Sequence, residues 1–245
     1  MLGENEILEL AKARRIRPYQ EELRYLQALI LYSLSDSPLV AKGGTYLWMF
    51  HGLNRFSQDL DYTSIGGLPQ NLPRKVEETL MLFGVEGKGE VLKSDEFTFT
   101  FRLKLRGPLY HGEKDLRFVR VEVSLREKVK SIIPVRLEEF HYGIPLTYLR
   151  GMGLEEVLTE KIRAFLVRGE VKDLYDLWFL IKKGIKLDSG LLKEKLSFYG
   201  MKLELNDFLE KVEGMRYAWR GLEPMVFGLL PPFDEVLSVL RDLRA

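Results

Sequence analysis

The sequence predicts an α+β protein in which a mixed α/β part is followed by a helical part. Strand-like and helix-like patterns alternate through the first 150 of the 245 residues. From residue 154 onward the patterns are almost entirely helical. A chain of this length suits one large domain or two smaller ones. We therefore expect two domains, residues 1–150 and residues 151–245.

Composition excludes several classes of protein. The chain has no cysteine, so disulfide frameworks, thiolate zinc sites, iron–sulfur clusters and cysteine nucleophiles are excluded. The three histidines, His51, His111 and His141, lie far apart and form no short metal-binding motif. Lys and Arg number 37 against 36 Asp and Glu, which leaves a net charge of +1. This balance argues against a chain-wide nucleic-acid surface, although it allows a local basic patch.

The N-terminal segment MLGENEILELAKARRIRPY has no apolar signal-peptide region. No stretch approaches the roughly 18 uncharged apolar residues that a membrane span requires. We therefore expect a cytoplasmic protein without a membrane partner. The four Asn and four Gln against abundant Lys, Arg and Glu are a bias that is seen in thermophile proteins.

The elements of the first part follow from hydrophobic spacing. The segment after Pro18 carries Leu23, Leu26 and Ile30 at helical intervals, and Gly43-Gly44 separates a short apolar run from a run of bulky residues. In chain order we expect a helix interrupted near Pro18, a buried strand, a short helix, a strand and another helix, over residues 4–35, 38–41, 45–53, 58–63 and 70–83.

The next two strands have the clearest pattern in the chain. The runs FTFTFRLKL, residues 97–105, and RFVRVEVSL, residues 117–125, each alternate polar and apolar residues. Turn-forming residues stand between them, which predicts an antiparallel hairpin. Short strands and turns follow over 132–150. The helical part is expected to break at Gly169, Gly184, Gly200 and Pro231-Pro232.

Lys42-Gly43-Gly44-Thr45 stands where a strand ends and a helix begins. Backbone N–H groups at a helix N-terminus receive phosphate well, and glycines let a ligand approach the backbone closely. The Thr45 hydroxyl adds a further donor. The alternative interpretation is an ordinary helix cap without a ligand.

Asp59-Leu60-Asp61 follows this turn in the sequence. On a strand, Asp59 and Asp61 project from the same face, and their charges repel unless a cation lies between them. Mg²⁺ suits such a site, because it binds through a few carboxylates together with substrate phosphates. Glu122 adds a third carboxylate if its strand neighbours this one. The alternative for all three acids is a solvated strand surface.

Two helical segments carry further candidates. On a helix over 154–168, Lys161 falls inside the apolar stripe, where a lysine must pair with an acid, face a ligand or extend to the surface. A lysine that contacts triphosphate oxygens is the functional interpretation. In Lys172-Asp173-Leu174-Tyr175-Asp176, either acid is a candidate, although an acid in the first helical turn also stabilises the helix.

Taken together, these segments resemble a known family. The runs KGGTYLWMFHGLNRFSQDLDY, TEKIRAFLVRG and KDLYDLWFL, in this order, resemble the AbiEii nucleotidyltransferases over about residues 18–180. These proteins are toxins of type IV toxin–antitoxin systems, including abortive phage-infection systems. The resemblance implies a nucleotidyltransferase-like small mixed sheet with flanking helices, plus a helical C-terminal domain.

The resemblance also implies roles for individual residues. Nucleotide binding would fall to the glycine turn, to the Arg-x-Ser segment and to the helical lysine, which are Lys42, Gly43, Gly44, Thr45, Arg55, Ser57 and Lys161. The catalytic set would be Asp59, Asp61, Glu122, Lys161 and Asp173, with Asp176 as the second choice for the last acid. Asp59, Asp61 and Glu122 would hold the metal, which is Mg²⁺, with Mn²⁺ as the alternative.

The implied reaction is transfer of a nucleoside monophosphate from an NTP to an acceptor hydroxyl, with release of pyrophosphate. The acceptor expected from the family is RNA, at the 3′ end of tRNA, and a cognate antitoxin would act without a stable complex. Two other functions stay open on the sequence. One is transfer to a small-molecule or protein hydroxyl, and the other is NTP binding without catalysis.

Overall fold

The computed structural model, which describes residues 2–241, divides into two compact units. The first comprises the chain up to Gly52 together with Phe56–Gly151, and the second comprises Leu53–Arg55 together with the chain from Met152 onward. The main division therefore falls beside the predicted boundary at residue 150. The sequence did not predict that Leu53–Arg55 belongs to the second unit. These residues join it because Arg55 forms a β-bridge with Val226 and an ion pair with Asp176.

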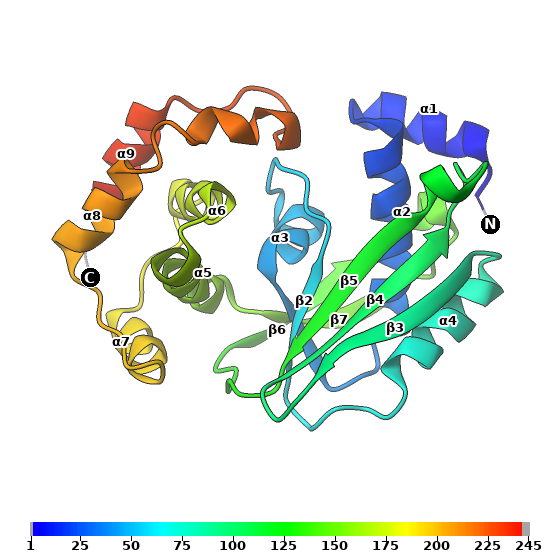
Figure 1. The fold of residues 1–245 in the computed structure, drawn as a ribbon, viewed down its shortest axis with the longest axis horizontal. Coiled ribbons are helices and arrows are strands. Elements are labelled where there is room, and N and C mark those ends of the chain that lie inside the picture. The colour runs from blue at the N-terminus through cyan, green and yellow to red at the C-terminus, as the bar shows by residue number, and fades with distance from the viewer. Residues whose placement is uncertain (1, 242–245) are drawn as a thin grey trace. The chain divides into compact units, whose positions relative to one another are not determined.

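The first unit is a mixed sheet of seven strands with flanking helices (Figure 1). The strand order is β3-β4-β5-β2-β1-β7-β6. The strands are β1 Leu39–Lys42, β2 Leu60–Ser64, β3 Glu86–Ser94, β4 Thr98–Arg106, β5 Arg117–Ser124, β6 Ile132–Leu137 and β7 Thr147–Met152. The helices are α1 Glu4–Arg14, α2 Pro18–Ser33, α3 Gly43–His51 and α4 Leu72–Leu82, with short 3₁₀ turns at Glu113–Asp115 and Phe140–Tyr142.

The hairpin predicted from the two alternating runs is confirmed, because β4 and β5 pair antiparallel. Their inward side chains, among them Phe101, Leu103, Val119 and Val121, have no exposed surface. Burial of each such side chain stabilises the fold by roughly 1.5–3 kcal/mol. These strands are therefore fixed by the apolar face that the sequence pattern already marks.

Strand β3 was missed in the sequence. Its residues EGKGEVLKS include two glycines, and most of its side chains are exposed. It pairs with β4 at one edge of the sheet, where only one neighbour is needed. An edge strand without a buried face has no alternating hydrophobic pattern, so hydrophobic periodicity does not predict it.

The second unit is helical, as predicted. Its helices are α5 Leu154–Arg168, α6 Val171–Lys182, α7 Ser189–Ser197, α8 Leu205–Glu213 and α9 Phe233–Arg241, with a 3₁₀ segment at Trp219–Met225. Gly169, Gly184 and Gly200 stand at the predicted breaks with φ of 63°, 84° and 66°. Glycine adopts this left-handed conformation without steric cost, so these helices end where the sequence indicates.

Nowhere between residues 2 and 241 is there a helix long and apolar enough to cross a membrane.

Candidate active site

The glycine turn lies between β1 and α3. Lys42 at the end of β1 is extended, and Gly43 then adopts φ of +80° as the chain enters the helix. A Cβ atom added to Gly43 would lie only 2.1 Å from Oδ2 of Asp61. Glycine is therefore required here for its conformation and for the space that the carboxylate occupies. The turn places the first N–H groups of α3, which have no partner within the helix, beside an acidic side chain.

Buried polar contacts hold the acidic segment against this turn. The Thr45 hydroxyl donates to the Asp59 carbonyl at 2.6 Å, and the Thr45 side chain has no exposed surface. The amide of Gln27 on α2 donates to the carbonyls of Ser57 and Gln58, at 3.0 and 2.8 Å. Sequence reasoning missed Gln27, although a polar residue inside an apolar helical face was an available signal. The Thr45 hydroxyl thus fixes the backbone of Asp59, and its contact with phosphate stays a prediction.

Strand pairing brings two of the predicted acids together. Strand β2 pairs in parallel with β5, and Asp61 is in register with Glu122. On its other side β2 pairs with β1, where Asp61 is opposite Lys42. The condition set for Glu122, that its strand neighbours the acidic pair, is confirmed. Asp59 differs from the expectation, because β2 begins at Leu60 and Asp59 precedes the strand.

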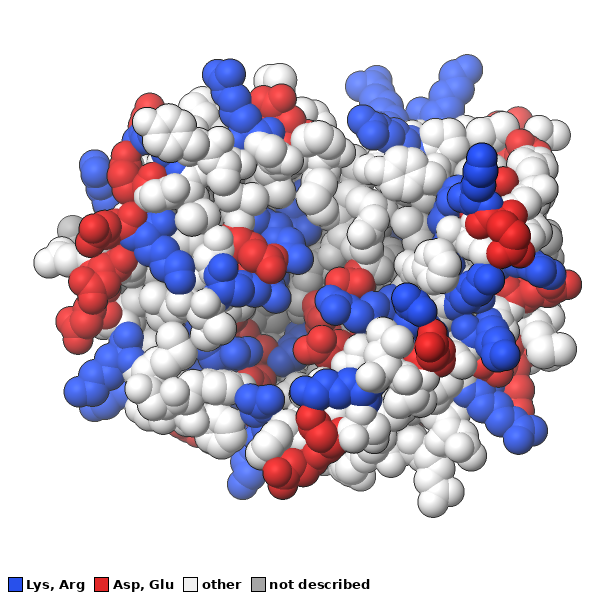
Figure 2. All heavy atoms as spheres, viewed as in Figure 1, with Lys and Arg blue, Asp and Glu red and all other residues white. Residues whose placement is uncertain are grey.

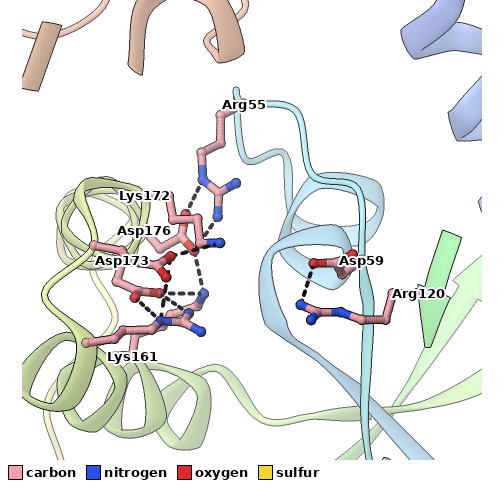
Figure 3. Close-up of polar contacts among 9 residues, drawn as sticks. Arg55, Asp59, Arg120, Lys161, Lys172, Asp173 and Asp176 are labelled. Carbon is pink, nitrogen blue, oxygen red and sulfur yellow. Dashed lines mark hydrogen bonds and ion pairs between the residues drawn. The ribbon is translucent and has the colours of Figure 1, made fainter. Parts of the chain in front are cut away.

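Asp59 has a partner that the sequence did not predict. Its Oδ2 accepts a hydrogen bond from Nη2 of Arg120 on β5 at 3.0 Å (Figure 3). Within residues 2–241, no three His, Asp or Glu side chains are grouped so that they could hold a metal ion. The predicted three-acid set of Asp59, Asp61 and Glu122 is thus not assembled in this structure, and the arginine draws one member of it into an ion pair.

Lys42 also differs from expectation. Its ammonium lies 3.1 Å from Oε2 of Glu127, and the two side chains are only 13% and 4% exposed. This ion pair is the contact that the structure shows, and the contact of Lys42 with nucleotide stays a prediction. Ser57 is half-buried, and its carbonyl accepts from Gln27.

In the second unit, Arg55 binds Asp176 through two hydrogen bonds. Nε and Nη2 donate to the two carboxylate oxygens, each at 2.7 Å (Figure 3). Both side chains are almost fully buried. The guanidinium is thus engaged inside the protein, and the nucleotide contact expected of Arg55 stays a prediction. It also anchors Leu53–Arg55 to α6.

Lys161 on α5 extends into the same cluster. Its Nζ lies 2.7 Å from Oδ2 of Asp176 and 3.3 Å from Oδ1 of Asp173. Burial alone would lower the pKa of Lys161, but the carboxylates of Asp176 and Asp173 outweigh burial and raise it. The ammonium is therefore charged at neutral pH. The sequence alternative of a lysine extending to the surface is wrong, because the side chain is only 9% exposed.

Asp173 connects this cluster to the end of α5. Arg168 donates to its two carboxylate oxygens at 2.6 and 2.7 Å. Burial alone would raise the pKa of both aspartates, but their cationic partners outweigh it: the Arg168 hydrogen bond and Lys161 lower the pKa of Asp173, and Arg55 and Lys161 lower that of Asp176. Both candidate acids of α6 thus contact Lys161. We name Arg55, Lys161, Arg168, Asp173 and Asp176 the buried ion cluster.

Solved structures share this fold. MenT4, a nucleotidyltransferase toxin from Mycobacterium tuberculosis H37Rv, matches with a TM-score of 0.67 and 20% identity, over 100% of this chain and 91% of that one. A putative nucleotidyltransferase from Helicobacter pylori matches with a TM-score of 0.65 and 22% identity, over 90% of this chain and 91% of that one. JHP933 from Helicobacter pylori matches with a TM-score of 0.58 and 19% identity, over 88% of this chain and 85% of that one. None of the curated proteins matches the chain.

The mixed sheet, with its glycine turn and its carboxylates on neighbouring strands, has the fold of these structures. The family model described as the nucleotidyl transferase AbiEii toxin of a type IV toxin–antitoxin system matches residues 24–239. The chain therefore belongs to the AbiEii nucleotidyltransferase toxins. Membership of this family implies an NTP substrate and an antitoxin.

Proposed function

We propose that the protein uses Mg²⁺ to transfer a nucleoside monophosphate from an NTP to a hydroxyl of RNA, at the 3′ end of tRNA. The observation that carries this proposal is the contact between the glycine turn and the Asp61 carboxylate. It places a cation-binding group beside backbone N–H donors suited to phosphate. A Mg²⁺–triphosphate complex needs these two kinds of group next to each other.

The donor set fits Mg²⁺ as an ion that arrives with the nucleotide. Asp59 and Asp61 are hard oxygen ligands, and Mg²⁺ in nucleotide sites usually takes one or two carboxylates and completes its shell with phosphates and water. A preformed cluster of three acids is therefore not required. When bound, the ion would supply charge neutralisation at the phosphates; Mn²⁺ offers the same coordination chemistry.

The chain's own residues would act by positioning. The N–H groups of Gly43 and Gly44 would bind phosphate oxygens, and Thr45 would hold Asp59 in place through its carbonyl. Glu122, in register with Asp61, would lie beside the acceptor hydroxyl.

The choice of RNA as acceptor has two supports. The first is membership of a toxin family, since modification of a tRNA end would block protein synthesis. The second concerns the length of RNA contacted: the net charge is +1, and on the face drawn in Figure 2 basic and acidic side chains are interspersed. Such a surface favours recognition of a short RNA end over a long backbone contact. We further propose a cytoplasmic role in phage defence, opposed by an antitoxin without a stable complex.

The test is labelling of total RNA with each radioactive NTP in the presence of Mg²⁺. We expect label from one NTP at an RNA 3′ end. Asp59→Asn and Asp61→Asn should lower labelling about a hundredfold or more, since loss of metal coordination removes several kcal/mol of transition-state stabilisation. Asp36→Asn is the matched control, because Asp36 is an exposed acid on the same unit, paired with Lys75.

Two outcomes would contradict this proposal. Unchanged labelling in Asp59→Asn and Asp61→Asn would remove the acids from the reaction. Label on a small molecule or on protein, with none on RNA, would reassign the acceptor.

A further inference from the structure

Arg120 is bonded to Asp59 of the acidic site, although no motif marks it. It stands on β5 two residues before Glu122, so both side chains project from the same face of the sheet. The first registered pair of β2 and β5 is Leu60 with Val121. The residue before each of these, Asp59 and Arg120, is therefore expected at neighbouring positions, and the hydrogen bond between them is 3.0 Å long.

The guanidinium of Arg120 holds one of the acids assigned to the metal. Its Nη2 donates to Oδ2 of Asp59 at 3.0 Å. The other two acids, Asp61 and Glu122, each lie two residues further along the chain and are in register with each other. Arg120 therefore takes the place of a cation beside Asp59.

The ion pair is also open to exchange. The Arg120 side chain is 49% exposed and that of Asp59 is 38% exposed. Ion pairs with this exposure contribute little stability, so a competing cation can replace the arginine at small cost. Guanidinium binds phosphate oxygens as readily as carboxylates, often through two parallel bonds.

We propose that Arg120 is a positioning residue that pairs with Asp59 before substrate binds and exchanges partners when the metal–nucleotide complex arrives. Asp59 passes from the guanidinium to the metal ion, and the guanidinium passes from Asp59 to a phosphate oxygen. Each charge keeps an opposite charge beside it throughout. This inference rests on the proposed function, because it takes Asp59 as a metal ligand.

The exchange makes metal binding depend on the nucleotide. A bare divalent ion must displace Arg120 and leave it without a partner, so it binds weakly. A metal–polyphosphate complex offers Arg120 a new partner and binds tightly. Removal of the guanidinium should therefore have opposite effects on the two ligands, and a purely structural role predicts no such opposition.

The experiment measures two affinities of the full-length protein by Mn²⁺ electron paramagnetic resonance: for Mn²⁺ alone, and for the complex of Mn²⁺ with inorganic tripolyphosphate. Tripolyphosphate contains no base, so the identity of the NTP is not needed. We expect Arg120→Gln to bind Mn²⁺ alone about threefold to tenfold more tightly than the wild type, and the complex more weakly by a similar factor. Arg120→Lys keeps the charge, so each of its two affinities should lie between those of the wild type and Arg120→Gln.

Arg102→Gln is the matched control. Arg102 is directly opposite Arg120 on β4, but it pairs with Glu90 instead. The Arg102→Gln variant removes one positive charge from the same face of the sheet without changing the partner of Asp59. We expect both of its affinities to stay within twofold of the wild type.

Three results would overturn the inference. These are unchanged affinities in Arg120→Gln, a shift of both affinities in the same direction, or the same shifts in Arg102→Gln. Asp59→Asn tests the proposed function separately. If this variant binds both ligands as the wild type does, Asp59 is not a metal ligand, and the proposed function fails together with the inference.

Discussion

The two units hold their candidate acids in opposite ways. In the second unit, Asp173 and Asp176 are fully buried within the buried ion cluster and bonded to three cationic side chains. In the first unit, Asp59 is more than a third exposed and holds one arginine. Buried, well-partnered charges are fixed because separating them leaves a bare charge in a medium of low polarity, whereas an exposed pair separates easily. One cluster is thus built to stay in place, and the other is suited to exchange with a ligand.

The largest expected effect comes from breaking the buried cluster. Asp176→Asn removes the charge that Arg55 and Lys161 share, so it should lower the free energy of unfolding by about 3–5 kcal/mol. Asp59→Asn is the comparison variant and should lower it by less than about 1 kcal/mol. Urea unfolding of both variants measures the difference. An equal loss of unfolding free energy in the two variants would show that burial does not make the Asp176 pairs more stabilising than the Asp59 pair.

A smaller effect is expected from pH. The pKa values of Asp173 and Asp176 are lowered in the folded protein. Their contribution to stability is therefore complete above the ordinary pKa of 3.8 and is lost as the pH falls through the lowered values. The gap in stability between the wild type and Asp176→Asn should stay constant from pH 8 to about pH 5 and narrow below about pH 4. A gap that stays the same down to pH 2 would contradict these pKa directions.

The smallest expected effect comes from salt and concerns the exposed pair. At an ionic strength of about 1 M the screening length falls to about 3 Å, so Arg120 competes less with a cation for Asp59. The difference in affinity for Mn²⁺ alone between Arg120→Gln and the wild type should shrink from about threefold to tenfold at low salt to nearly nothing. Titrations at two NaCl concentrations measure it. If the full difference in Mn²⁺ affinity persisted in high salt, the competition between Arg120 and the cation would not depend on an exposed ion pair.

The sequence by itself determined the fold class, the family and most element positions. The alternating runs of β4 and β5 and the glycines at helix ends are local signals, because period and backbone freedom act within a few residues. The position of Lys161 inside an apolar stripe left open whether its side chain is buried or extends to the surface, and the structure shows it only 9% exposed. By contrast, β3 carries no such signal, since its faces are exposed at the sheet edge.

Only the tertiary structure decided which partner each charged group has. Arg55 and Asp176 are 121 residues apart in the sequence, and Asp59 and Arg120 are 61 apart. The resemblance assigned Arg55 and Lys42 to nucleotide binding, which stays a prediction, and only the structure shows that they pair with Asp176 and Glu127. The physical reason is that an ion pair depends on distance in space and on burial, and chain spacing reports neither once strands and helices have packed.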